Sequence, residues 1–139
     1  NEIISIIDDK DIVDNAESMD KNELIILPLT EIKSENEFFD YEAKYTQGKA
    51  SEITPPENLD FKHELELKAT SSLIYNKLGC KGIVRIDFIL ATTGLYFIEI
   101  NTVPGMSEAS IVPKQAKAMG INISDLFGLC VENIFEKNY

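Results

Sequence analysis

Two runs of β-branched and aromatic residues, 83–90 and 95–101, dominate the second half of the chain. A short polar link that ends in Gly94 separates them, a pattern typical of a β-hairpin. We expect a three-residue loop in which Gly94 adopts the left-handed conformation and closes a type I turn. Such a loop would place Ala91 opposite Leu95.

Counting back from that pair predicts two cross-strand pairs, Asp87 with Glu99 and Arg85 with Asn101. Side chains alternate between the faces of a strand, so these four polar groups would share one face of the sheet. The opposite face would be apolar and able to pack on helices. Its members would be Val84, Ile86, Phe88, Leu90, Tyr96, Ile98 and Ile100.

The first half contains two further strand-like runs, residues 2–7 and 24–32, which we expect to pair as an antiparallel meander. Pro28 should bend the second run or place it at a sheet edge. Residues 8–23 are acidic and polar and predict a long exposed connection. Residues 34–57 have neither helical nor strand periodicity, although they are rich in aromatic residues, and a stretch of this length is usually functional or disordered.

Three helices are expected in the remaining sequence. The first should run from an N-cap at Asn58 to Leu78, with Asp60 in its first turn and Gly79 just beyond its end. His63 is predicted to be a solvated surface side chain, because it lies off the packing stripe of this helix. That stripe, at helical spacing, consists of Phe61, Leu65, Ala69, Ser72 and Leu73.

The second helix should begin at Ser110, whose hydroxyl would cap it, accept Pro113 in its first turn and end at Gly120. Ser124 should begin the third helix, which is amphipathic. Together these elements predict an α+β fold with a single domain, in which helices back an antiparallel sheet of roughly four strands. The apolar residues of the third helix are Leu126, Phe127, Cys130, Ile134 and Phe135.

Composition narrows the class of protein. With 139 residues, 44% hydrophobic and 27% charged, the chain has the make-up of one soluble globular domain. It contains no apolar run near the ~20 residues of a membrane span and no signal-peptide pattern, so we expect a cytoplasmic protein. The net charge of −11 argues against nucleic acid as a partner. Cys80 and Cys130 are expected to be buried free thiols, and with His63 as the single histidine they predict no zinc site.

Candidate chemistry lies on the polar face of the hairpin. Asp87 and Glu99 would repel each other at directly opposed positions, so a cation is expected between them. Mg²⁺ prefers oxygen ligands of this kind, and Asn101 supplies a further neutral oxygen. Arg85, the only arginine in the chain, suits a phosphate or a developing oxyanion. An exposed sheet face with a cluster of cross-strand charges is the alternative interpretation.

Four sequence motifs resemble those of the ATP-grasp enzymes. Residues 85–87, RID, followed by residues 99–107, EINTVPGMS, are similar to the C-terminal metal and phosphate site of that family. More narrowly, residues 40–46, DYEAKYT, with residues 53–55, ITP, resemble the mobile active-site loop of the D-alanine–D-alanine ligases. The resemblance extends over residues 27–135, and it identifies 34–57 as that loop.

The resemblance implies roles for the polar groups. Asp87 and Glu99 would hold one Mg²⁺ or Mn²⁺, and Glu99 and Asn101 would hold a second. Arg85 and the Gly105 N–H would stabilise an oxyanion, in agreement with the run of backbone N–H groups that the chain offers around Gly105.

It also implies sites for the substrates. The Ser110 hydroxyl and the Ile111 N–H would hold the carboxylate of the second substrate at a helix N-terminus. Tyr45 would join the catalytic group by docking against other parts of the enzyme when the loop closes and excludes water. Contacts to the co-substrate ATP are assigned to Lys44 at a phosphate, Phe38 near the base, Ile89 and Ile98.

The reaction implied by the resemblance joins two D-alanine molecules for peptidoglycan. ATP would phosphorylate the carboxylate of the first, and the amine of the second would attack the acyl phosphate. The chain begins without methionine, which suggests a fragment. The resemblance implies that it is a C-terminal portion, which lacks the N-terminal and central domains of the family and is inactive alone; the full-length enzyme could form a homodimer. Two alternatives stay open: another ATP-grasp carboxylate–amine ligase, and a non-catalytic acidic interaction domain.

Overall fold

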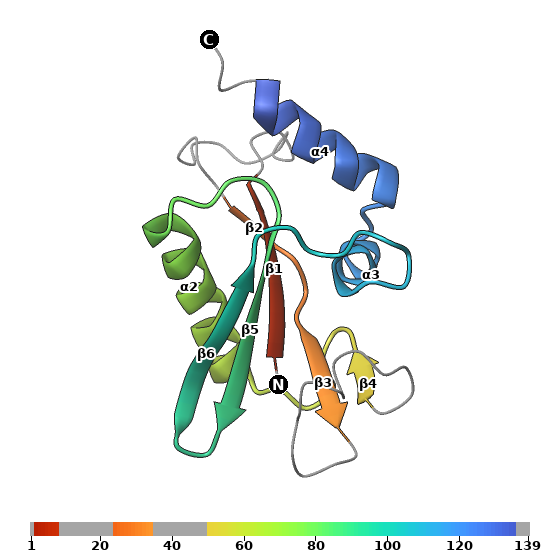
Figure 1. Cartoon of the computed structure of the whole chain (residues 1–139). Coiled ribbons are helices and arrows are strands. Elements are labelled where there is room, and N and C mark those ends of the chain that lie inside the picture. The colour runs from red at the N-terminus through yellow and green to blue at the C-terminus, as the bar shows by residue number, and fades with distance from the viewer. Residues whose placement is uncertain (1, 9–23, 35–49, 136–139) are drawn as a thin grey trace, which may run out of the picture.

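The structure is a computed structural model, and it describes residues 2–8, 24–34 and 50–135 (Figure 1). The predicted connection at 8–23 and most of the loop predicted at 34–57 lie outside these ranges. Strands and helices are both present, with the helices beside an antiparallel sheet, which confirms the predicted α+β class.

The sheet contains six strands in its described part, rather than the roughly four that were predicted. Its order is β4-β3-β1-β5-β6, and β2 pairs with β1 in line with β3. The strands are β1 (Glu2–Asp8), β2 (Leu24–Ile26), β3 (Thr30–Ser34), β4 (Ala50–Ile53), β5 (Val84–Ala91) and β6 (Gly94–Asn101). Every pairing is antiparallel.

The predicted pairing between 2–7 and 24–32 is confirmed, but the second run is split into β2 and β3. Residues 27–29, with Pro28 at their centre, interrupt it, because proline cannot donate a ladder hydrogen bond. The prediction that 34–57 contains no strand was wrong, because β4 pairs with β3 from Ser34 opposite Ala50 onward. The sequence of β4, ASEI, is too short for an alternation pattern to stand out.

The hairpin of β5 and β6 keeps the predicted pairs at its open end, with Asp87 opposite Glu99 and Arg85 opposite Asn101. Its turn differs from the prediction. Ala91 pairs with Gly94, so the loop has two residues instead of three, and Gly94 has a φ of 139°. A β-bulge between Asp87 and Phe88 places one extra residue, Ile98, in β6 and restores the predicted register.

The bulge also changes which side chains of β6 face the helices. Phe97, and not Ile98 as the predicted register required, lies opposite Phe88, and the two rings meet edge to face with centroids 6.1 Å apart. Tyr96 lies opposite Ile89 on the other face, where its hydroxyl hydrogen-bonds with that of Thr93. The assignment of Tyr96 to the apolar face was therefore wrong, since an extra residue inverts the alternation beyond it, and Ile98 is the residue without a cross-strand partner.

Helix α2 (Phe61–Lys77) packs against the apolar face of the sheet (Figure 1). Asp60, not Asn58, is its N-cap, because the Asp60 carboxylate accepts a hydrogen bond from the His63 N–H. His63 is half-buried, and its Nδ1 lies 2.6 Å from the same carboxylate, so the prediction of a free surface histidine was incomplete. Leu78 is the C-cap, and Gly79 follows it at positive φ as predicted.

The predicted packing stripe of α2 was wrong: most of its members are exposed, including Phe61 (78%) and Leu73 (57%). The buried side is lined by Leu67, Ser71 and Tyr75. Two hydrogen bonds offset the burial of polar groups here, since Ser71 donates to the Leu67 carbonyl and the Tyr75 hydroxyl donates to the carbonyl of Gly82. The first core cluster comprises Leu29, Leu67, Tyr75, Val84, Ile86 and Phe88.

Helices α3 (Ile111–Ala118) and α4 (Ile123–Phe135) pack on each other and close a second core cluster. Gly120 follows the C-cap of α3 at positive φ, as predicted. Helix α4 begins at Ile123 rather than at Ser124, and Asn122 caps it, because the Asn122 side-chain oxygen accepts a hydrogen bond from the Asp125 N–H. The second cluster comprises Leu27, Ile83, Val112, Ala116 and Leu126.

Cys80 and Cys130 are free thiols, as predicted, but both are partly rather than fully buried, and each packs at the margin of one core cluster. Burial raises the pKa of both thiols. Of the helices that the structure describes, none combines the length and apolar character needed to span a membrane.

Candidate active site

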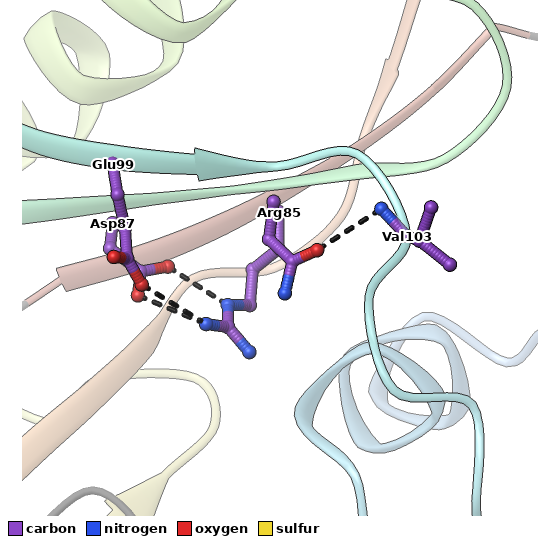
Figure 2. A network of polar contacts seen from close by, with 5 residues as sticks. Arg85, Asp87, Glu99 and Val103 are labelled. Atoms are coloured by element: carbon purple, nitrogen blue, oxygen red, sulfur yellow. Dashed lines mark hydrogen bonds and ion pairs between the residues drawn. The ribbon is translucent and has the colours of Figure 1, made fainter.

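The polar face of the hairpin brings four predicted side chains together. Arg85 and Asp87 are two positions apart on β5, so they share a face, and their cross-strand partners are Asn101 and Glu99. Figure 2 shows the side chains of Arg85, Asp87 and Glu99 pointing away from α2, toward the side of the sheet where α3 lies. The structure therefore confirms their juxtaposition, although not their chemical roles.

The cation between the two carboxylates is the guanidinium of Arg85 (Figure 2). Its Nε donates to Asp87 Oδ1 at 2.9 Å, and one terminal nitrogen donates to Asp87 Oδ2 at 3.1 Å. The same terminal nitrogen lies 3.8 Å from Glu99 Oε1. This fork-to-carboxylate geometry is the strongest that arginine makes with an acid, and it holds Asp87 with only 7% of its surface exposed.

Asn101 orients the turn that follows β6. Its side-chain oxygen accepts a hydrogen bond from the Val103 N–H at 3.0 Å. An amide oxygen has two lone pairs, so the Asn101 oxygen keeps acceptor capacity beyond this bond. The bond fixes the start of the segment that leads to Gly105.

Gly105 lies against Ser110, the N-cap residue of α3. A Cβ added at Gly105 would meet Ser110 Oγ at 2.8 Å, so a larger residue here would push the Ser110 hydroxyl out of its present position. The Ser110 hydroxyl makes no capping bond, contrary to prediction; it shares a hydrogen bond of 2.8 Å with the hydroxyl of Ser107. The hydroxyl is thereby held at the N-terminus of α3 beside the Ile111 N–H without satisfying a helix donor.

Lys114, one turn into α3, ties this helix to the sheet. Its Nζ donates to Glu52 Oε2 of β4 at 2.7 Å. Sequence reasoning missed this pair and the Ser107 hydroxyl, because partners 62 residues apart leave no local signal and Ser107 stands in an irregular segment. The pair links α3 to β4, the strand that follows residues 35–49.

Of the other predicted site residues, two lie in the described part of the chain and three do not. Ile89 and Ile98 are both partly exposed, and Ile89 lies on the face that carries Asp87. Phe38, Lys44 and Tyr45 lie outside the residues that the structure describes.

The donor set fits a divalent cation of the hard type. Asp87 and Glu99 provide carboxylate oxygens from directly opposed positions, and Asn101 provides an amide oxygen one residue pair further along. Mg²⁺ takes one or two carboxylates and completes its shell with water and phosphate oxygens. Within the described ranges no cluster of three or more His, Cys, Asp or Glu side chains occurs.

The chain is similar in sequence to known proteins. Residues 11–132 match the family described as D-ala D-ala ligase C-terminus. A D-alanine–D-alanine ligase of Flavobacterium johnsoniae is 46% identical over 114 residues, which are 81% of this chain and 34% of that protein. One from Bacteroides fragilis is 42% identical over 117 residues, 83% of this chain and 35% of that protein. The chain thus spans about a third of the length of the curated relatives it matches.

Solved structures agree with the sequence matches. A D-alanine–D-alanine ligase from Bacillus anthracis, complexed with ATP, superposes with a TM-score of 0.69 at 31% identity and covers 97% of this chain and 39% of that one. A D-Ala:D-Ser ligase from Enterococcus faecalis superposes with a TM-score of 0.67 at 28% identity, covering 94% of this chain and 35% of that one.

Proposed function

The chain belongs to the D-ala D-ala ligase family, and from this premise we propose that it supplies the metal- and phosphate-binding half of an ATP-dependent ligase that joins two D-alanine molecules. The product would be the dipeptide used for peptidoglycan, made in the cytoplasm where ATP is available. The observation that carries the proposal is the opposed pair of Asp87 and Glu99, with Arg85 and Asn101 on the same face.

In this proposal Asp87, Glu99 and Asn101 would hold Mg²⁺ or Mn²⁺, in two ions that share Glu99. When bound, the cations would neutralise charge on the phosphates of ATP. Arg85 would stabilise negative charge that develops on oxygen during transfer of the phosphoryl group, because its planar, permanently charged fork matches two oxygens at once.

The segment after β6 would bind the reacting carboxyl groups. The Gly105 N–H would donate to the oxyanion, since a residue without Cβ allows a close approach of the substrate to the backbone. Ser110 and the Ile111 N–H would grip the carboxylate of the attacking D-alanine at the N-terminus of α3. The hydrogen bond between Ser107 and Ser110 supports this role, because it orients the Ser110 hydroxyl without using it as a cap.

The loop predicted within residues 34–57 would close over the nucleotide, with Lys44 at a phosphate, Phe38 near the base and Tyr45 against other parts of the enzyme. Ile89 and Ile98 would add apolar contacts to ATP, in keeping with their partial exposure beside the site. The rest of the site would come from the part of the enzyme that this chain does not include, and the chain alone would then lack ligase activity.

A second candidate concerns the attacking substrate. One structural neighbour is named as a D-Ala:D-Ser ligase, and its likeness to this chain is close to that of the D-alanine–D-alanine ligases. An enzyme that accepts D-serine in place of the second D-alanine is therefore the alternative. Incubating the full-length enzyme with ATP, D-alanine and D-serine, and weighing the dipeptides by mass spectrometry, separates the two.

The test of the proposed function is a pair of isosteric changes in the full-length enzyme. Asp87→Asn and Glu99→Gln each remove an anionic ligand, so D-alanine-dependent phosphate release should fall by at least about a hundredfold. Glu99→Gln should be the more severe, because Glu99 would bridge both ions. Glu66→Gln, on the exposed side of α2, is the matched control and should retain activity. Near-normal turnover of Glu99→Gln at ordinary Mg²⁺ would overturn the assignment.

A further inference from the structure

Arg85 lies where the divalent cation would bind. Both oxygens of Asp87 accept hydrogen bonds from its guanidinium, at 2.9 and 3.1 Å, and the Glu99 carboxylate is 3.8 Å from the same group. Asp87 is buried, the Arg85 side chain is 21% exposed, and the Glu99 side chain is 49% exposed. The guanidinium thus offsets the repulsion between two carboxylates that the sheet holds opposite each other.

A metal ion cannot simply be added to this arrangement. Two carboxylates and one guanidinium carry a net charge of −1, and a second cation beside the guanidinium would be strongly repelled, because a partly buried site screens charge poorly. The fork of Arg85 also points at the oxygens of Asp87 that a metal would need. Both the repulsion between the cations and the competition for the Asp87 oxygens end if the guanidinium moves away as the metal binds. An arginine side chain is long and flexible enough to do so.

We propose that Arg85 is a resident counter-cation that holds Asp87 and Glu99 in place before the metal binds, and that metal binding displaces it. The inference rests on the proposed function, because it uses the same metal ligands. Displacement frees the guanidinium for an anionic oxygen of the nucleotide or of the reaction, so that the site gains its anion-binding arginine only when its metal is loaded. Metal and guanidinium therefore exclude each other at Asp87, while metal and bound anion favour each other.

The first test measures Mn²⁺ binding to the 139-residue chain, without nucleotide, by electron paramagnetic resonance of the free ion. Arg85→Gln removes the competing charge and should bind Mn²⁺ about tenfold more tightly than the unmodified chain. Lys68→Gln removes one positive charge from an ion pair with Glu64 on α2, so it changes the net charge equally and should bind like the unmodified chain. Equal or weaker binding by Arg85→Gln would overturn the proposal.

The same titration separates failure of the inference from failure of the proposed function. Asp87→Asn should weaken Mn²⁺ binding both in the otherwise unmodified chain and in combination with Arg85→Gln. The metal assignment itself fails, and the inference with it, in either of two cases. In the first, neither the unmodified chain nor Arg85→Gln binds Mn²⁺; in the second, Asp87→Asn leaves Mn²⁺ binding unchanged. If binding depends on Asp87 but not on Arg85, the metal site stands and the inference alone is wrong.

The second test needs no substitution, because Arg85 is the only arginine in the chain. In a ¹⁵N-labelled sample the Nε–H group of arginine therefore gives one correlation, and its bond to Asp87 should slow its exchange with water. Titration with Mg²⁺ should shift this signal and accelerate its exchange, in step with shifts at the Asp87 and Glu99 amides. An unchanged Arg85 signal while those amides respond would show that the guanidinium stays in place.

Discussion

Asp87 lies directly opposite Glu99 on the neighbouring strand because Ile98 is an extra residue in β6. A two-residue turn joins the strands, and a regular ladder from that turn would place Asp87 opposite Ile98, with Glu99 on the other face of the sheet. The bulge adds one position and returns Glu99 to the face of Arg85 and Asp87. A local irregularity of the backbone thus sets the geometry of the candidate metal site.

Ser110→Ala should leave stability almost unchanged while it weakens substrate binding. An N-cap serine normally contributes ~1 kcal/mol through its side chain, but the Ser110 hydroxyl makes no capping bond. In the full-length enzyme the KM for the second D-alanine should rise at least about tenfold, because a hydrogen bond to a carboxylate is lost. Urea denaturation of the chain and initial rates of the enzyme measure the two effects.

Ser107→Ala provides the control for that prediction. It removes the hydroxyl that bonds Ser110 but leaves Ser110 itself, so its effect on KM should be smaller than that of Ser110→Ala. A loss of more than about 1 kcal/mol in Ser110→Ala would indicate that the serine acts as a cap after all.

Leu67→Ala and Leu73→Ala should differ sharply, although both lie on α2. Leu67 is fully buried, so its truncation should cost about 2–5 kcal/mol of unfolding free energy. Leu73 is 57% exposed, and Leu73→Ala should change stability by less than about 1 kcal/mol. Chemical denaturation of the chain decides the point, and similar losses in the two variants would show that the wrong side of the helix had been identified as buried.

The sequence predicted the class of fold, the hairpin, the pairing of its open end and the four polar groups on one face. It failed where the outcome depends on tertiary context. Spacing favoured Phe61, Leu65 and Leu73 as the packing side of α2, yet Ser71 and Tyr75 are buried because the main chain provides partners for their hydroxyls. The spacing of apolar residues in a helix predicts that one side packs, but it does not show which side the neighbouring elements cover.

The bulge was missed for a different reason. No glycine marks position 98, and the loop rule that was applied to Gly94 placed the extra residue in the turn. Both arrangements give Asp87 the same partner, so the pairing of Asp87 with Glu99 was predicted correctly from an incorrect turn. The position of Tyr96 distinguishes the two arrangements. Tyr96 lies on one face of the sheet if the extra residue is in the turn, and on the other face if the extra residue is Ile98.

The thiols of Cys80 and Cys130 should react slowly. Burial raises the pKa of each above the usual value of 9.0, so the reactive thiolate is scarcer at mildly alkaline pH in the folded chain than in the unfolded chain. Carboxymethylation by iodoacetamide, followed by mass spectrometry, should be slower without urea than with it and should accelerate as the pH rises. Equal rates in the folded and unfolded chain would contradict the burial of both groups.

Deleting Ile98 should preserve the pairing of Asp87 with Glu99. Phe97 pairs with Phe88 on one side of the extra residue, and Glu99 pairs with Asp87 on the other, so removal of Ile98 joins the two segments into one regular ladder. Backbone nuclear Overhauser effects between positions 87 and 99 should persist.

Deleting Phe97 instead gives the same register but loses the edge-to-face contact with Phe88. The Phe97 deletion should therefore be less stable than the Ile98 deletion by roughly 0.5–1.5 kcal/mol beyond the loss of buried area. Loss of the contact between positions 87 and 99 in the Ile98 deletion would contradict this prediction. It would show that the pairing of Asp87 with Glu99 requires the bulge.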